Sequence, residues 1–358
     1  MRAETPRRIA VFRALQLGDL LCAVPALRAM RAAWPRARIC LIGLPWAADF
    51  VSRMPYIDDF IEFPGFPGMP ERTPDLAAWP AYLAEVRKRD FDLAIQMHGC
   101  GVLTNALVAA MQASRSAGFF LPGREGPQPE IAVPWPQDLP EVRRLLLLTE
   151  SIGAPSRGEH LELPILPGEA AAWVALREEL ALDAEGAPHG YICVHPGARL
   201  ATRRWPPERF AAVADELAEA GYRIVLTGTM GEGALTAQVA ASMAAEADDL
   251  AGRTELGTLA ALVAQAELVI CNDTGISHVA AAMCTPSVVV CCGADAARWQ
   301  PLDGGRHQVL WHPVGCRPCA YDACPTDHEC ATAISASDVV REAFSLLALF
   351  GESGREPA

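Results

Sequence analysis

The sequence is nearly without lysine: Lys88 is the only one, and the other 29 of the 30 basic residues are arginines. Acids outnumber bases, 43 to 30, which gives a formal net charge of −13 for 358 residues. This deficit of positive charge excludes a general nucleic-acid binder, because such proteins neutralise phosphates with clustered Lys and Arg. It leaves room for a local arginine pocket that binds one phosphate group.

Long apolar runs are missing as well. No stretch reaches the roughly 18 uninterrupted apolar residues of a membrane-spanning helix, and the residues before the first apolar run, 9–12, contain no signal-peptide core. We therefore expect a cytoplasmic protein whose 12 cysteines are thiols. The first strand-to-helix turn also lacks the phosphate-binding motifs GxGxxG and GxxxxGK[ST].

Paired carboxylates at the expected binding edge are lacking too. A divalent metal bound through phosphates usually needs such a pair. Asp58, Asp59 and Asp92 come closest, and we interpret them as strand-edge or loop residues. We expect no bound metal and no cofactor.

What is present is an alternation of short apolar runs with helical patterns, which indicates parallel α/β sheets. Strands are expected at 9–12, 38–43, 91–97, 191–194, 222–226, 268–271 and 287–291. Helices are expected at about 19–33, 206–220, from 231, near 257–266, from 274 and at 337–350. The Pro- and Gly-rich region 120–140 predicts a surface loop, and 161–168 predicts a linker. The predicted fold class is α/β, with Rossmann-like doubly wound domains at 1–165 and 166–358; the last helix is also a candidate to pack back on the first domain.

Doubly wound sheets bind ligands beyond the carboxyl ends of their strands, so the loops there are the candidate sites. Gly18 and Asp19 follow the first strand, where Asp19 either caps the helix or faces a ligand as a general base. His195 and Gly197 follow the strand 191–194.

Arginines come next in that second loop. Arg203 and Arg204 precede Trp205, and they either bind phosphate oxygens or belong to a solvated basic loop.

Two further loops carry polar residues at strand ends. The segment from Thr227 to Glu232 is glycine-rich, and Glu232 either accepts hydrogen bonds from a ribose or only complements the helix dipole. The most informative loop runs from Asn272 to His278. It puts an acid, a hydroxyl and a glycine, Asp273, Thr274 and Gly275, at a helix start with His278 one turn later. This combination favours an anion site over a packed core histidine.

Together these motifs resemble glycosyltransferase family 9, the ADP-heptose:lipopolysaccharide heptosyltransferases. The matching pieces run in family order over about residues 8–350: 17–19 with 25–27, 195–198, 203–206 and 272–278. The cysteine-rich segment 316–330 resembles the branch of the second heptosyltransferase. The resemblance implies a GT-B type fold of two facing domains with the active site in the cleft, the N-terminal domain binding acceptor and the C-terminal domain binding donor.

The activity implied is inverting, metal-independent transfer of a heptose from ADP-heptose to a lipopolysaccharide inner-core acceptor. Asp19 would be the catalytic base, and Arg203, where the family usually has lysine, would act on the leaving diphosphate. The implied donor-binding residues are His195, Gly197, Arg203, Thr227, Glu232, Asp273, Thr274, Gly275 and His278. Acceptor contacts are expected from Gly18 and His98, the latter also open to a structural role.

Some alternatives stay open. Other family members use a different nucleotide sugar or acceptor, and a non-catalytic homologue would only bind the donor. The cluster Cys316, Cys319, Cys324 and Cys330 is compatible with zinc, an iron–sulfur cluster, disulfides or, preferred here, reduced structural thiols.

The implied acceptor is a lipid-linked saccharide at the inner membrane surface, so we also consider peripheral membrane contact. Two candidate contact surfaces are the basic residues Arg28, Arg31, Arg36 and Arg38 around Trp34, and the loop 63–70. A solvated face is the preferred interpretation of the basic residues.

Overall fold

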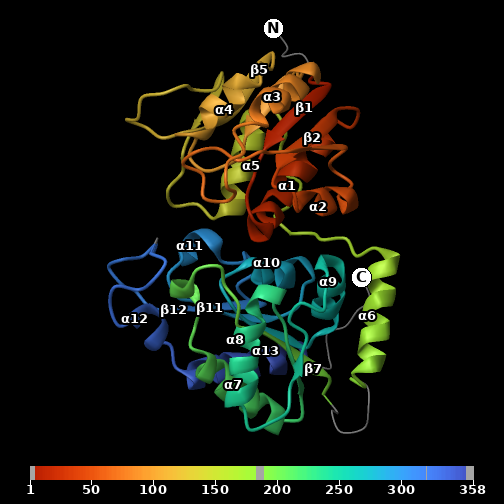
Figure 1. Ribbon diagram of the computed structural model, residues 1–358, viewed down its shortest axis with the longest axis vertical. Helices are drawn as coiled ribbons and strands as arrows, with labels where there is room; N and C mark the ends of the chain where they lie inside the picture. Colours follow the sequence, from red (N-terminus) through yellow and green to blue (C-terminus); the bar gives the residue numbers. More distant parts are fainter. Residues whose placement is uncertain (1–4, 183–188, 320, 352–358) are drawn as a thin grey trace. The chain divides into compact units, whose positions relative to one another are not determined.

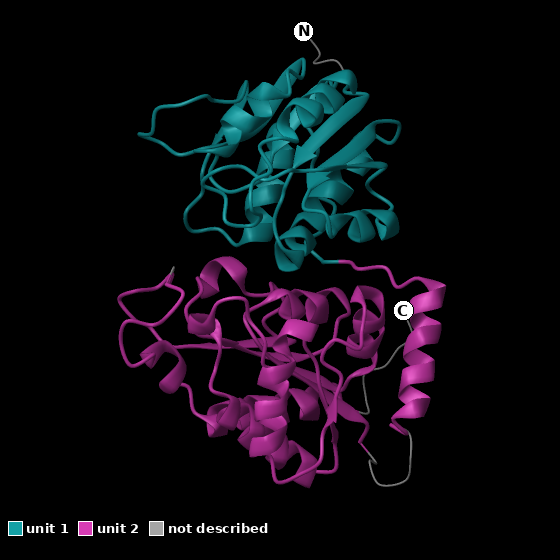
Figure 2. Ribbon diagram, in the orientation of Figure 1, with its two compact units in different colours: residues 1–161 teal, residues 162–358 magenta. Residues whose placement is uncertain are grey.

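The computed structural model describes residues 5–182, 189–319 and 321–351. The chain divides into two compact units, residues 1–161 and 162–358 (Figure 2), where a boundary at 165/166 was expected. Within the described ranges, no helix is both long and apolar enough to cross a bilayer.

The first unit contains a six-stranded sheet in the order β3-β2-β1-β4-β5-β6, with every pair parallel. Its strands are β1 (Arg8–Phe12), β2 (Arg38–Gly43), β3 (Asp59–Glu62), β4 (Leu93–Gln96), β5 (Arg115–Phe120) and β6 (Ile131–Pro134). Parallel neighbours need crossover connections, which here contain helices except for the loop from β5 to β6. The crossover helices are α1 (Leu17–Ala33), α2 (Ala47–Arg53), α3 (Trp79–Lys88) and α4 (Thr104–Ala110), and α5 (Glu141–Ser151) follows β6.

Alternate residues of the first sheet pack on opposite faces. Ala10 and Phe12 of β1 belong to one buried cluster with Tyr82 of α3 and Leu107 of α4. Helices α1 and α5 pack against each other, and α5 also contacts β5 and β6 (Figure 1). The central strands are therefore apolar on both sides, which leaves their ends as the place for polar side chains.

The second unit repeats the same winding. Its sheet order is β12-β11-β10-β7-β8-β9, again all parallel. The strands are β7 (Tyr191–His195), β8 (Arg223–Leu226), β9 (Asp248–Asp249), β10 (Leu268–Asn272), β11 (Ser287–Cys291) and β12 (His307–Trp311). The helices are α6 (Pro167–Glu179), η1 (Ala201–Arg203), α7 (Pro207–Glu219), η2 (Met230–Glu232), α8 (Gly233–Ser242), α9 (Leu256–Gln265), α10 (Gly275–Ala282), α11 (Ala296–Trp299), α12 (Glu329–Thr332) and α13 (Ala336–Phe350).

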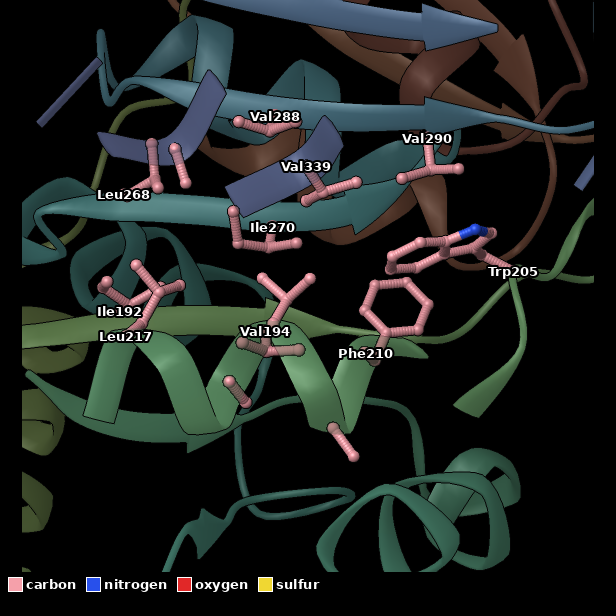
Figure 3. Close-up of a cluster of buried hydrophobic side chains, with 14 of the residues drawn as sticks. Ile192, Val194, Trp205, Phe210, Leu217, Leu268, Ile270, Val288, Val290 and Val339 are labelled. Atoms are coloured by element: carbon pink, nitrogen blue, oxygen red, sulfur yellow. The ribbon is translucent and has the colours of Figure 1, made fainter. Parts of the chain in front are cut away.

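The main core of the second unit lies between this sheet and helices α7 and α13 (Figure 3). Val339 of α13 packs with Ile270 and Val288 of the strands, so the last helix belongs to the second unit. Trp205 is fully buried at one end of this core, with its ring edge-on to Phe210 at 5.0 Å between centroids. Its indole N–H donates to the Ile334 carbonyl, 3.1 Å away.

One local expectation needs correction: the region 120–140 is not wholly a loop, because it contains the edge strand β6. The two candidate contact surfaces stay predictions. In the loop 63–70, Phe63 and Met69 are buried and Trp79 donates to the Gly65 carbonyl, whereas Pro67, Gly68 and Pro70 are exposed. Among the basic residues, Arg28 donates to the Gly158 and His160 carbonyls, Arg31 and Arg38 pair with Asp58 and Asp59, and Arg36 and Arg38 are exposed.

The acids near β4 lie far from any binding edge. Asp90 and Asp92 do form an Asp-x-Asp pair in the sequence. Asp92 accepts from the Arg7 and Arg8 amides, however, and Asp90 pairs with the Arg8 guanidinium at 2.6 Å. Arg8 begins β1, so both acids lie at the amino ends of the strands, opposite to the end where ligands bind.

The burial of Trp205 gives a stability prediction. We expect Trp205→Ala to lower the free energy of unfolding by about 3–5 kcal/mol, and Trp205→Phe, which keeps the contact with Phe210, by less than half as much. Urea unfolding measures both. Trp311, half exposed on β12, is the matched control, and Trp311→Ala is expected to cost no more than about 1 kcal/mol. Equal losses at the two tryptophans would contradict this account of the core.

Candidate active site

The predicted site residues gather where the winding of each sheet reverses. In the first unit β1 lies between β2 and β4, and in the second unit β7 lies between β8 and β10. In each sheet the connections after the two central strands, β1 and β4 or β7 and β10, therefore leave in opposite directions. This reversal opens a crevice at the carboxyl ends of these strands. Asp19 and His98 follow β1 and β4. His195 and Asp273 follow β7 and β10 in the same way.

Asp19 lies in the first turn of α1. Its carboxylate accepts a weak hydrogen bond from the Gln16 amide at 3.3 Å, so it does cap the helix, and its side chain keeps 20% of its exposure. Its Oδ1 lies 3.9 Å from Nη2 of Arg13. Gly18, beside it, is buried. The capping role therefore leaves Asp19 partly accessible to a ligand.

Arg13 is a residue that the sequence did not single out. It follows β1 directly, and its side chain is fully buried. Its guanidinium donates to the main-chain carbonyls of Asp19 and Met97 and to the Glu141 carboxylate. A charged residue at the end of an apolar run can indicate a residue at the ligand-binding end of a strand, but Arg13 did not stand out among the 29 arginines of the sequence.

His98 is buried beside this arginine. Its ring stacks on Phe12 with 5.5 Å between centroids, and its Nε2 lies 3.9 Å from the Glu71 carboxylate. Burial, reinforced by the charge of Arg13, lowers the pKa of His98 to about 3. The imidazole is therefore neutral at physiological pH, and its buried Nδ1 has no hydrogen-bond partner among the described residues. A neutral ring suits hydrogen bonding to a ligand better than proton transfer.

In the second unit, four predicted donor residues meet at the ends of β7 and β8. His195 Nδ1 lies 3.1 Å from the Thr227 hydroxyl, and burial lowers the pKa of this histidine. The Glu232 carboxylate accepts from the amide and hydroxyl of Thr229, which caps η2. It also fills the space next to Gly197, where any Cβ would collide with Glu232 Oε1. Glycine at 197 thus lets the carboxylate lie against the backbone of the first loop.

Asn272 holds two of these loops together, a role the sequence did not reveal. It is fully buried at the end of β10. Its Oδ1 accepts from the Trp205 amide at 2.9 Å, and its Nδ2 donates to the Pro196 carbonyl at 2.8 Å. The His195 loop and the arginine loop are therefore fixed to the same strand end by one side chain.

Asp273, the next residue, has an unusual environment. Burial raises its pKa to about 6, although the charge of Arg203 and a hydrogen bond from the Cys291 thiol act in the opposite direction. Arg203 ends η1, and its buried Nε has no hydrogen-bond partner in the described part of the chain. A carboxyl group and a guanidinium thus share one partly desolvated corner.

Helix α10 starts at the same corner. Thr274 is its N-cap, and the Thr274 Oγ1 is buried without a partner among the described residues. The Ser277 amide and hydroxyl both donate to the Thr274 carbonyl, which fixes the first turn. Gly275 begins the helix, and His278 is buried near the Trp299 ring. A helix N-terminus, an orphaned hydroxyl and Arg203 together form the features of an anion site.

The cysteine-rich segment contributes a second arginine that was not predicted. Arg317 donates to the carbonyls of Cys291, Cys292, Ala294 and His312, which ties the segment to the end of β11. Its charge also lowers the pKa of Asp273. Two residues of this segment contact Thr202, the residue before Arg203: the main-chain carbonyl of Tyr321 accepts from the Thr202 hydroxyl, and His328 Nε2 lies 2.8 Å from the Thr202 carbonyl.

The cysteines themselves are spread over this segment. Cys319 and Cys330 are buried, Cys324 is half-buried and Cys316 is exposed. None of the chain's twelve cysteines, all within the described ranges, forms a disulfide. Across the residues that the structure describes, no three His, Cys, Asp or Glu side chains are grouped as a metal site.

Comparison with known proteins identifies the family. The model of glycosyltransferase family 9 (heptosyltransferase) matches residues 81–329. The chain belongs to glycosyltransferase family 9. The match includes His98 and every site residue of the second unit, whereas Asp19 and Arg13 precede it.

Individual members of the family agree with this assignment. Lipopolysaccharide heptosyltransferase 2 of Escherichia coli K12 is 25% identical over 304 residues, covering 76% of this chain and 79% of the relative. Among solved structures, the glycosyl transferase family 9 protein of Veillonella parvula gives a TM-score of 0.79 at 20% identity, covering 98% and 99% of the two chains. The E. coli ADP-heptose lipopolysaccharide heptosyltransferase II gives 0.74 at 21%, covering 96% and 99%. This family-9 glycosyltransferase thus has the GT-B type architecture that the motifs predicted.

The raised pKa of Asp273 gives a pH-dependent prediction. A carboxyl whose pKa is about 6 in the folded protein and near 3.9 when unfolded stabilises the fold at low pH, and this contribution is lost as the pH rises through 6. Asp273→Asn cannot ionise, so its Tm should rise relative to the wild type by roughly 2–6 °C between pH 4 and pH 7.

Asp338→Asn is the control with the opposite sign. The Ser335 hydroxyl lowers the pKa of Asp338, so its contribution is present above the ordinary pKa and lost as the pH falls. This variant should be less stable than the wild type at pH 7 and approach it at pH 4. A constant difference in Tm between Asp273→Asn and wild type across this range would show that Asp273 is not desolvated.

Proposed function

We propose that this glycosyltransferase moves a heptose from ADP-heptose to the inner core of a lipopolysaccharide, with inversion at the transferred carbon and without a bound metal. The family description and the names of the relatives support the donor and the acceptor class. The acceptor in this proposal is a lipid-linked saccharide at the inner membrane surface, so the protein would act there peripherally.

The anion site at the start of α10 carries the proposal for the second unit. As the bond between the sugar and the diphosphate breaks, negative charge develops on the leaving ADP. Arg203, the Thr274 hydroxyl and the N-terminal amides of α10 supply positive potential and donors at one place. Arg317 adds a second cation near Asp273. These groups perform the charge stabilisation for which other glycosyltransferases use a divalent ion.

The nucleoside end of the donor would lie at the ends of β7 and β8. Glu232 offers carboxylate oxygens that suit ribose hydroxyls, and His195 and Thr227 form its neighbouring polar pair. Gly197 leaves room for that carboxylate. His278, one turn after Thr274 in α10 and next to Trp299, would also contact the donor.

The first unit would hold the acceptor. Asp19 is the proposed base, because it is a partly exposed carboxylate at the crevice beside β1. The acceptor oxygen forms a bond to the anomeric carbon while the bond to the diphosphate breaks, its proton passes to Asp19, and ADP leaves with the electron pair. Attack from the face opposite to the leaving group inverts that carbon. His98, neutral and with an unsatisfied Nδ1, would bind an acceptor hydroxyl next to Gly18.

Replacement of the proposed base tests the chemistry. Asp19→Asn keeps an oxygen for the helix cap but cannot take a proton, so kcat for transfer should fall at least about 100-fold while the Kd for ADP-heptose is unchanged. Asp49→Asn is a matched control, since Asp49 is also an acid in the first turn of a helix of the same unit. Transfer by Asp19→Asn within tenfold of the wild type would exclude Asp19 as the base.

A screen of donors by thermal shift tests the substrate. ADP-heptose at about 100 times its Kd should stabilise the protein by roughly 2.7 kcal/mol, a rise of several degrees in Tm, and other nucleotide sugars should stabilise it less. Arg203→Met should remove most of the shift. Arg199→Met, an exposed arginine of the same loop, should keep it. A larger shift with another nucleotide sugar would identify a different donor.

A further inference from the structure

Arg13 is the most completely buried charge in the first unit's site. Its side chain has no exposure, and a buried guanidinium cannot lose its proton to escape the cost of desolvation. The protein must therefore provide acceptors and counter-charge. Main-chain carbonyls of Asp19 and Met97 accept from it, and Glu141 lies 3.1 Å away as its first counter-ion.

Glu141 also lies close to a second cation. This carboxylate is buried and lies 3.7 Å from a second buried guanidinium, that of Arg144. Arg144 also stacks on Trp135 and donates to the Gln137 carbonyl. Glu141 thus interacts with two buried cations and is not the counter-ion of Arg13 alone.

Asp19 is the second carboxylate near Arg13. Its Oδ1 is 3.9 Å from Arg13 Nη2, and its own carbonyl accepts from Arg13 Nε at 2.8 Å. Among the described residues, the carboxylates that pair with Arg13 are those of Asp19 and Glu141, whereas His98 is neutral and Glu71 lies 3.9 Å from His98. An opposite charge at this distance favours the ionised form of a carboxyl group.

We infer that Arg13 is a positioning residue for the transfer reaction, which holds the main chain at Asp19 and keeps the Asp19 carboxylate ionised before the acceptor binds. The inference rests on the proposed role of Asp19 as the base. It has a consequence for turnover: when Asp19 takes the acceptor proton, the positive charge of Arg13 loses part of its compensation, and release of that proton to water restores it. Glu141 acts in the opposite direction, because it already neutralises part of Arg13.

The two partners should therefore shift the same titration in opposite directions. Removal of the cation in Arg13→Met should raise the apparent pKa on the acidic side of the pH profile of kcat/KM, the acidic limb, by about one pH unit. Arg13→Lys keeps a positive charge and should restore much of the wild-type profile. Removal of the anion in Glu141→Gln should lower that pKa. A purely structural role of either residue would lower activity at all pH values without moving the limb.

The experiment compares pH profiles of kcat/KM for these variants of the full chain with matched surface controls. Arg143→Met and Glu150→Gln change an exposed arginine and an exposed glutamate on the same helix α5, and both should leave the limb in place. Shifts of equal sign in Arg13→Met and Glu141→Gln, or no shift in either, would overturn the inference. If Arg13→Met does not fold, Arg13→Lys and Glu141→Gln still decide it.

A direct titration separates this inference from the proposed function. The carboxyl carbon of Asp19, assigned by its loss in Asp19→Asn, can be followed by 13C NMR in wild type and Glu141→Gln. A lower Asp19 pKa in Glu141→Gln supports the electrostatic coupling even if Asp19→Asn still catalyses transfer, in which case only the role of Asp19 as base is wrong. An unchanged Asp19 pKa contradicts the coupling whatever the activity.

Discussion

The parallel pairing of every strand constrains the rest of each unit. Parallel neighbours need crossover connections, nearly all of which contain helices here. These helices cover both faces of the sheet, so the central strands must be apolar on both sides. Ile192, Val269 and Ile270 are all fully buried for this reason, and each sits in a strand with almost no exposed side chain. Polar chemistry is left with the carboxyl ends, and the reversal of winding beside β1 and β7 decides which ends form a crevice.

The apolar runs of the sequence were enough to predict the central strands, because this constraint makes those strands apolar on both faces. Strands β2 and β11 have the residue bounds expected from their apolar runs, and Gly221 ends α7 with a positive φ of 94°. The edge strands β3, β6, β9 and β12 were missed, because an edge strand is only half buried and needs no apolar run. The strand β5, which lies next to β6, was missed as well. The order of the strands was not predicted, and the candidate site was proposed from motifs at strand ends and the family resemblance rather than from periodicity.

The residues that were not predicted depend on partners far away in the chain. Arg13 donates to groups 84 and 128 positions later, and Asn272 joins residues 67 and 76 positions earlier. A sequence window around either residue contains neither partner. Asp19 and Asp273 could be proposed from their position after a strand, but the sequence left open whether Asp19 caps α1, and it did not indicate that burial raises the pKa of Asp273. The type of a side chain indicates which chemistry it could perform, whereas its burial in the fold shifts its pKa and so sets its protonation state before a ligand binds.

The cysteine-rich segment is held at two points, by the Tyr321 carbonyl and by His328, both on Thr202. Between these points lie residues 322–327, of which five are exposed and Cys324 is half-buried. The ends of this arc are fixed by the fold, so its length is nearly irrelevant to stability: doubling a flexible loop costs only about 0.6 kcal/mol. The arc is thus a tolerant insertion point next to the loop that carries Arg203, where a fluorescent reporter could be fused close to the proposed donor site.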